Sequence, residues 1–121
     1  MARTSGDERE LKRLREICRA IPGAAETSSW GHANWRAGKK KIFAEYEELR
    51  GVQTLSLFVG DARVDDFLED RRFSLPRYTD HHGWVCLKLD RSTDWKEIKT
   101  LVLDAHALVV AVEPGKTGGT D

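Results

Sequence analysis

The sequence lacks any long apolar run, and no segment approaches the roughly 18 residues needed to cross a bilayer. Its first residues also lack the apolar segment of an export signal, so we expect a cytoplasmic protein with no membrane contact. Cysteine is scarce as well: Cys18 and Cys86 cannot form a disulfide framework, and we expect both to be reduced thiols that pack as small apolar groups.

The familiar motifs of enzymes are also missing. The chain has no GxGxxG or GxxxxGK[ST] segment to hold phosphates, no GxSxG turn, and no HxH or HExxH pair to aim two imidazoles at one metal ion. We therefore expect no enzymatic activity, no cofactor and no metal. Two alternatives stay open: a metal site assembled from distant histidines, and a nucleophile that pairs Cys86 with His81 or His82.

Net charge is absent too, because 20 basic residues balance 20 acidic ones. Basic and acidic residues are not evenly distributed along the chain, however. No carboxylate occurs between Glu26 and Glu45, whereas four cations do: Arg36, Lys39, Lys40 and Lys41. A protein that binds nucleic acid needs such a local basic surplus, since its affinity comes from neutralising phosphates and releasing counterions. The segment 30–43, WGHANWRAGKKKIF, is therefore the strongest candidate for a binding site.

Hydrophobic periodicity predicts a mixture of helices and antiparallel strands. We expect helices at 7–21, from Asp61 onward and from Asp94 to Val112, and strands at 27–30, 35–37, 41–46, 52–59 and 84–89. Gly31 and Asn34 are expected to form a turn between the first two strands. The order helix–strands–helix–strands–helix indicates an α+β fold, an antiparallel sheet with helices packed on one face. We expect one domain over residues 1–113 and a flexible tail over 114–121.

The basic segment reads as a hairpin whose turn presents lysines to phosphate. Aromatic rings on a neighbouring sheet face could stack on bases at roughly 1–3 kcal/mol per base. The predicted phosphate contacts are Arg36, Lys39, Lys40, Lys41, Arg77 and Lys88, and the residues predicted to stack or to support them are Trp30, Trp35, Trp84 and His32. A structural explanation competes with this one, because charged turns keep sheet edges soluble and tryptophans on strands are commonly buried.

Three segments in order resemble the MmcQ/YjbR family of small bacterial proteins, which are usually labelled DNA-binding: WGHANWRAGKKKIFAEY, FSLPRYTDHHGWVCLKLD and DWKEIKTLVLDAHALVV. The resemblance covers roughly residues 11–112. It implies a YjbR-like fold, similar to that of secretion chaperones, and a DNA-binding function. The residues that recur in the family fall on Trp30, Gly31, His32, Arg36, Lys41, Phe43, Pro76, Tyr78, Gly83, Trp84 and Trp95.

Together these observations favour a monomer or weak dimer that binds nucleic acid with little sequence selectivity. Two other functions stay open. The first is a drug-binding or resistance-associated protein that holds a small planar ligand against Trp30, Trp35 and Trp84. The second is a chaperone-like domain that binds a protein partner on the uncovered face of the sheet.

Overall fold

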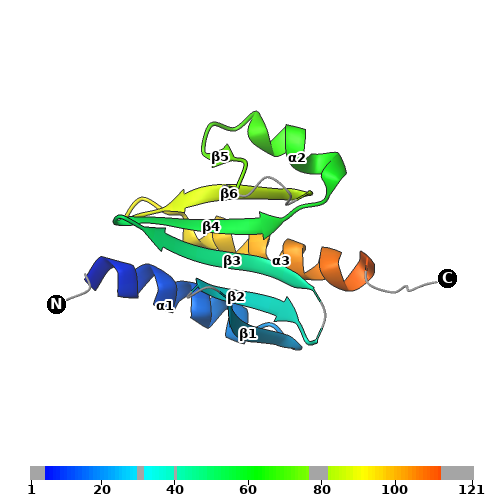
Figure 1. Cartoon of the computed structure of the whole chain (residues 1–121), viewed down its shortest axis with the longest axis horizontal. Coiled ribbons are helices and arrows are strands. Elements are labelled where there is room, and N and C mark those ends of the chain that lie inside the picture. Colours follow the sequence, from blue (N-terminus) through cyan, green and yellow to red (C-terminus); the bar gives the residue numbers. More distant parts are fainter. Residues whose placement is uncertain (1–4, 30–31, 40, 77–81, 113–121) are drawn as a thin grey trace.

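The computed structural model describes residues 5–29, 32–39, 41–76 and 82–112. Within these residues the elements are α1 (Ser5–Arg19), β1 (Ala24–Ser29), β2 (His32–Ala37), β3 (Ile42–Leu49), β4 (Val52–Phe58), α2 (Asp61–Leu68), β5 (Phe73–Ser74), β6 (Trp84–Leu89) and α3 (Trp95–Val112). Figure 1 shows their arrangement. No helix in the described ranges is long and apolar enough to span a membrane.

The six strands form one sheet in the order β1-β2-β3-β4-β6-β5, and every neighbouring pair is antiparallel. Helices α1 and α3 pack against one face of this sheet, and α2 lies beside β6 and β5 near one edge (Figure 1). The predicted α+β class and the predicted order of elements are confirmed. We call the face opposite α1 and α3 the outer face.

The core lies between the sheet and the two long helices. Leu55 and Leu57 on β4 are fully buried, as is Val85 on β6, because alternate side chains of these strands point towards α3. Helix α3 packs against them with a buried apolar stripe at helical spacing, formed by Ile98, Val102, Ala105 and Val109. Each such buried aliphatic side chain stabilises the fold by roughly 1.5–3 kcal/mol relative to an exposed one.

Several details differ from the sequence-based expectation, including the bounds of β1, β2 and β3, which shift by up to three residues. Asn34 does not form a turn but lies within β2, opposite Thr27 on β1 and Glu45 on β3. Hydrogen-bonded neighbours on both sides outweigh the turn preference of a single asparagine. The first helix ends at Arg19 rather than at residue 21. Strand β5 was not expected, because two residues are too few to show an alternating pattern.

The two cysteines are free and buried. Burial, with a smaller effect from the charge of Glu26, raises the pKa of Cys18 to about 12. Burial also raises the pKa of Cys86, although hydrogen bonds with Ser56 and Thr54 partly oppose this rise. Both thiols are therefore neutral at pH 7, which makes them poor nucleophiles.

Candidate nucleic-acid interface

The predicted basic turn connects β2 and β3. It closes through a hydrogen bond from the Ala37 amide to the Lys41 carbonyl (3.2 Å), and Gly38 takes a positive φ of 62° that favours glycine. Lys39 and Lys41 are exposed, and neither forms an ion pair with another described residue. Lys40, between them, lies outside the described residues. The turn thus carries two lysine side chains into solvent at one end of the sheet.

The segment between α1 and β1 lies against this turn. The Gly38 amide donates a hydrogen bond to the carbonyl of Gly23, which follows α1 by four residues (2.5 Å). Arg19 is the last residue of α1 and is exposed. Its position is electrostatically favourable, because a helix C-terminus carries partial negative charge. We call Arg19, Arg36, Lys39 and Lys41 the hairpin end.

Carboxylates are scarce in the sequence stretches that form the hairpin end. None occurs between Glu16 and Glu26 or between Glu26 and Glu45. The acid that interrupts these stretches, Glu26, is held by Arg15, with 3.0 Å between Nη2 and Oε2. Sequence reasoning missed Arg19 because it lies on a helix, 20 positions before Lys39. The acid-free stretch after Glu16 was the available signal.

Arg36 is held on the outer face of the sheet. Its Nε donates a hydrogen bond to the Thr27 hydroxyl on the edge strand β1 (3.3 Å), and that hydroxyl donates in turn to the Asn34 side-chain oxygen. The guanidinium is only partly exposed. Arg36 therefore adds positive charge beside the turn from a fixed position, whereas the lysines extend freely into solvent.

The tryptophans do not form an exposed aromatic surface. Trp35 is 1% exposed and belongs to the core, so it is unavailable for stacking on a base; of its two predicted roles only support fits. Trp84 is half-buried and packs edge-on against Phe58, with 6.1 Å between ring centroids. Trp30 lies outside the described residues.

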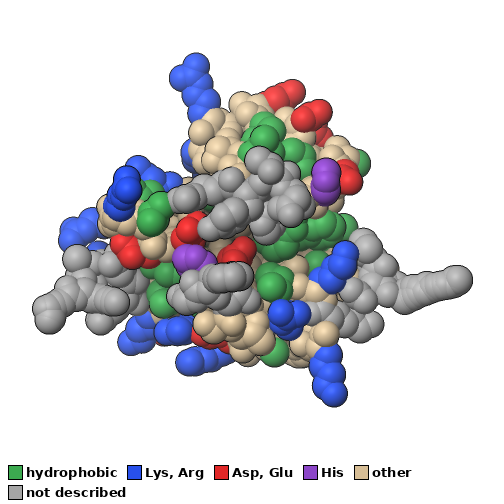
Figure 2. All heavy atoms as spheres, in the orientation of Figure 1, with side chains coloured by type: hydrophobic (Ala, Val, Ile, Leu, Met, Phe, Trp, Pro, Cys, Tyr) green, Lys and Arg blue, Asp and Glu red, His purple; other side chains and the backbone are tan. Residues whose placement is uncertain are grey.

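The outer face of the sheet is itself unsuited to a polyanion. Because side chains alternate along β3, Glu45 and Glu47 point to the face opposite Tyr46, which is in the core. His32 lies on the same face, with its Nε2 3.7 Å from Glu47 Oε2. In Figure 2, acidic side chains and a histidine lie near the middle of this face, whereas Lys and Arg side chains lie around its periphery. Phosphate contacts are therefore favoured at the ends of the sheet and not across it.

Lys88 does not join the hairpin end. Lys88 on β6 pairs with Thr54 on β4, and Thr54 pairs with Glu47 on β3. Glu47 is five positions along β3 from Ile42, the residue beside the turn. Five residues of strand correspond to about 17 Å. Lys88 and the basic turn therefore lie at opposite ends of the sheet, because the pairing of β3, β4 and β6 places Lys88 away from the turn. Arg77 lies outside the described residues.

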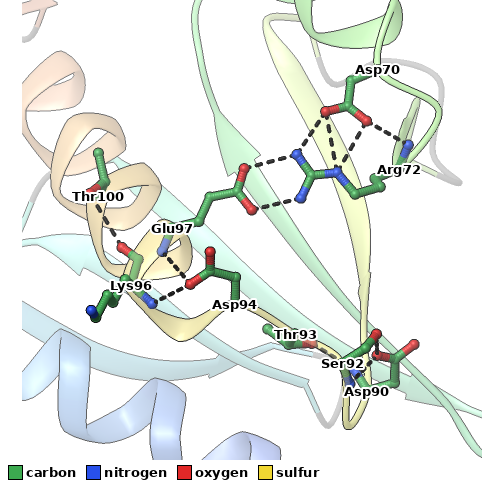
Figure 3. A network of polar contacts seen from close by, with 9 residues as sticks. All are labelled: Asp70, Arg72, Asp90, Ser92, Thr93, Asp94, Lys96, Glu97 and Thr100. Carbon is green, nitrogen blue, oxygen red and sulfur yellow. Dashed lines mark hydrogen bonds and ion pairs between the residues drawn. The ribbon is translucent and has the colours of Figure 1, made fainter.

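Near Lys88, a groove of about 410 Å³ is lined by both basic and acidic residues of β6, the segment before β5, and α3. One of its arginines is fully engaged. Arg72 binds Asp70 (Nη2–Oδ2, 2.7 Å) and Glu97 on α3 (Nη1–Oε1, 2.7 Å; Nη2–Oε2, 2.8 Å), as Figure 3 shows. The hydrogen bonds from Arg72 lower the pKa of Asp70 to about 2. This network connects the end of α2 to α3 and has a structural role.

Replacing Arg72 with glutamine is expected to return the Asp70 pKa towards 3.8, since the partner that stabilises the carboxylate is lost. A pKa that is depressed in the folded state stabilises the fold above the unfolded pKa and loses this effect as pH falls. The stability difference between the parent protein and Arg72→Gln should therefore be present at pH 6 and shrink between about pH 4 and pH 2. Urea unfolding across this range, with NMR titration of the Asp70 carboxyl, measures both effects.

Arg71→Gln is the matched control, because Arg71 is exposed and forms no ion pair with a described residue. It should leave the Asp70 midpoint unchanged. An Asp70 midpoint that stays near 2 in Arg72→Gln would contradict the role assigned to Arg72.

Both the sequence and the fold are similar to those of known proteins. The YjbR family model matches residues 19–108. The fold is similar to that of Deinococcus radiodurans protein DR2400, described as a DUF419 domain, with a TM-score of 0.69, 19% sequence identity, and coverage of 92% of this chain and 82% of that one. It is also similar to a structural-genomics target protein from Pseudomonas syringae, with a TM-score of 0.68, 17% identity, and coverage of 81% and 97%. None of the curated proteins matches significantly. The family model spans most of the chain, and the chain therefore belongs to the YjbR family.

Proposed function

We propose that this protein binds nucleic acid through phosphate contacts made by the hairpin end. The observation that carries the proposal is the hydrogen bond between the Gly38 amide and the Gly23 carbonyl. It places the segment between α1 and β1 beside the β2–β3 turn, and Arg19, four residues before Gly23, would add a further cation to those of Lys39 and Lys41. A cytoplasmic location, where nucleic acid is available, is part of this proposal.

The hairpin end offers four cations, and this small number limits the affinity. Contacts to phosphate carry little sequence information, so the protein would bind many sequences alike. Non-specific binding of this kind typically has a Kd of about 10⁻⁴ to 10⁻⁶ M at physiological salt. A monomer with one such end would associate and dissociate rapidly.

The double variant Lys39→Ala/Lys41→Ala is expected to weaken the salt dependence of DNA binding. Each phosphate neutralised on duplex DNA contributes about −0.9 to the slope of log affinity against log salt. Removing two contacts should therefore flatten the slope by nearly two units. Fluorescence anisotropy of a labelled 20-base-pair duplex, titrated at several salt concentrations, measures the slope.

The control is Lys96→Ala/Lys99→Ala, which removes the same charge from two exposed positions on α3. It should leave the slope within half a unit of that of the parent protein. An unchanged slope in Lys39→Ala/Lys41→Ala, or an equal change in the control, would refute a contact through the hairpin end. Arg19→Gln provides an independent check, with an expected flattening of about one unit.

The two alternative functions, binding of a planar ligand and binding of a protein partner, have less support. A planar ligand held against three indoles would need Trp35 at the surface, and Trp35 is buried. A protein partner on the outer face would meet Glu45, Glu47 and Lys88, so it would have to be polar. We also propose that the protein is not an enzyme, which is supported by the neutral, buried thiol of Cys86.

A further inference from the structure

A second group of arginines surrounds a small cavity near the start of α3. The cavity has a volume of about 260 Å³, and its lining residues are Arg9, Glu10, Arg13, Asp90, Arg91 and Trp95. Arg9 and Arg13 come from α1, and Arg91 comes from the segment between β6 and α3. Along α1, Arg9 precedes Arg19 by ten residues, or about 15 Å. The cavity is therefore separate from the hairpin end.

The guanidinium of Arg13 is held in place by an aromatic ring. Its central carbon lies 5.3 Å from the centroid of the Trp95 ring, and Trp95 packs in turn against the hydrophobic core. Stacking of a guanidinium on an indole leaves the N–H groups at its edge free to donate hydrogen bonds in the plane of the group. Arg13 is thus oriented before any ligand arrives, which reduces the entropy lost on binding.

The arginines of this cavity have no acidic partner among the described residues. Arg9, Arg13 and Arg91 form no ion pair there, whereas two arginines elsewhere do: Arg15 binds Glu26, and Arg72 binds Asp70 and Glu97. The cavity therefore contains three guanidinium groups that keep their hydrogen-bonding capacity for a ligand.

The two acids in the lining have other partners. Glu10 is 3% exposed, and its Oε1 accepts a hydrogen bond from Gln53 Nε2 (3.4 Å). Asp90 Oδ1 accepts from the amide (2.9 Å) and the hydroxyl (2.6 Å) of Ser92, and these bonds lower the pKa of Asp90. Three arginines and two acidic residues give the lining a formal net charge of +1. The charge favours an anion, and Asp90 weakens its binding.

We propose that this cavity is a phosphate-binding site in which Arg9, Arg13 and Arg91 donate hydrogen bonds to one phosphate group. A phosphate has oxygens that point in several directions, so it can accept paired hydrogen bonds from more than one guanidinium. A carboxylate has only two oxygens in one plane and accommodates one or two guanidinium groups. The phosphate group belongs either to a small molecule or to a nucleic acid strand. The proposal is independent of the proposed function, because it uses none of the residues of the hairpin end.

The test is calorimetric titration of the protein with sodium pyrophosphate at constant ionic strength. Arg91→Gln and Arg13→Gln should each weaken binding by about tenfold, because each removes a charged hydrogen-bond donor. Asp90→Asn should strengthen binding a few-fold, since its side-chain oxygen can still accept from Ser92 while the negative charge is removed. Arg91→Gln alters a loop position only, so it remains informative if Arg13→Gln disturbs packing against Trp95.

Arg15→Gln is the matched control, because it removes an arginine from the same helix but not from the cavity. It should bind pyrophosphate like the parent protein. Absence of pyrophosphate binding, equal weakening by Arg15→Gln, or no strengthening by Asp90→Asn would overturn the proposal.

Two further measurements are needed. One distinguishes a nucleic acid strand from a small molecule as the source of the phosphate, and the other distinguishes this cavity from the hairpin end. Displacement of pyrophosphate by a 20-nucleotide single strand would assign the site to a nucleic acid strand, and displacement by phosphate monoesters alone would assign it to a small molecule. Lys39→Ala/Lys41→Ala should bind pyrophosphate normally. If that variant lost pyrophosphate binding, the phosphate site would lie at the hairpin end and the inference would be wrong.

Discussion

Replacing Trp35 with alanine is expected to destabilise the protein by about 3–5 kcal/mol, because it removes a fully buried indole from the core. Trp35 lies on β2 opposite Ala44, a residue too small to fill the space that the ring would leave. Equilibrium unfolding in urea, followed by circular dichroism, measures the loss. A cost below about 1 kcal/mol would show that the ring is not packed as the structure has it.

Trp35→Phe separates the support of the fold from a direct role in binding. The Nε1–H of Trp35 is buried and has no hydrogen-bond partner among the described residues, and leaving such a donor unpaired costs about 1–3 kcal/mol. Phenylalanine retains an aromatic ring and removes this donor, so the variant should lose far less stability than Trp35→Ala. Its salt dependence of DNA binding should match that of the parent protein. A selective loss of DNA affinity in the stable Trp35→Phe variant would restore a stacking role for this residue.

The second large effect is expected for Gly83→Ala, at about 2–5 kcal/mol. Gly83 has a φ of 84°, in the left-handed region where an L-residue costs roughly 1–2 kcal/mol. An added Cβ would also lie 2.8 Å from Phe58 Cε1 and 3.2 Å from the Asp61 amide nitrogen. Overpacking of this kind typically costs a further 1–3 kcal/mol. The Gly83 carbonyl accepts hydrogen bonds from the amides of Val59 and Gly60, so the backbone there cannot easily move away.

Gly51→Ala is the control for backbone strain. Gly51 has nearly the same φ, 83°, but an added Cβ would meet no atom within 4 Å. It should therefore cost only the strain, roughly 1–2 kcal/mol. The difference in unfolding free energy between the two variants isolates the steric contribution at Gly83. Equal losses would mean that the Phe58 ring can move aside, and that only the backbone conformation requires glycine.

Gly83 and Trp95 show why family resemblance alone does not identify a functional site. Gly83 and Trp95 both lie in the segments on which the resemblance to the family rests. Gly83 is required by a close approach of the chain to Phe58, and Trp95 packs on the core while holding Arg13. Folding alone therefore explains a glycine at position 83, whereas Trp95 contributes both to the fold and to the proposed phosphate site.

Much of the fold could be predicted because local patterns and tertiary packing agree. In β6, Val85, Leu87 and Leu89 alternate with less apolar neighbours, and the strand has the predicted bounds. In α3, the apolar stripe predicts the buried face, and Asp94 caps the helix by accepting hydrogen bonds from the amides of Lys96 and Glu97. Asn34 was misplaced because its local preference for turns opposes the pairing of β2 with two neighbours.

The candidate site was less predictable, because it depends on which distant segments meet. The acid-free basic turn, the α+β class and the family could be predicted from the chain alone, since these depend on charge, periodicity and residue order. Three further facts required the folded structure: the segment after α1 lies beside this turn, Lys88 lies at the opposite end of the sheet, and Trp35 is enclosed. The physical reason is that sheet order and register are set by packing of the whole core, and neighbours across strands leave no periodic signal in the chain.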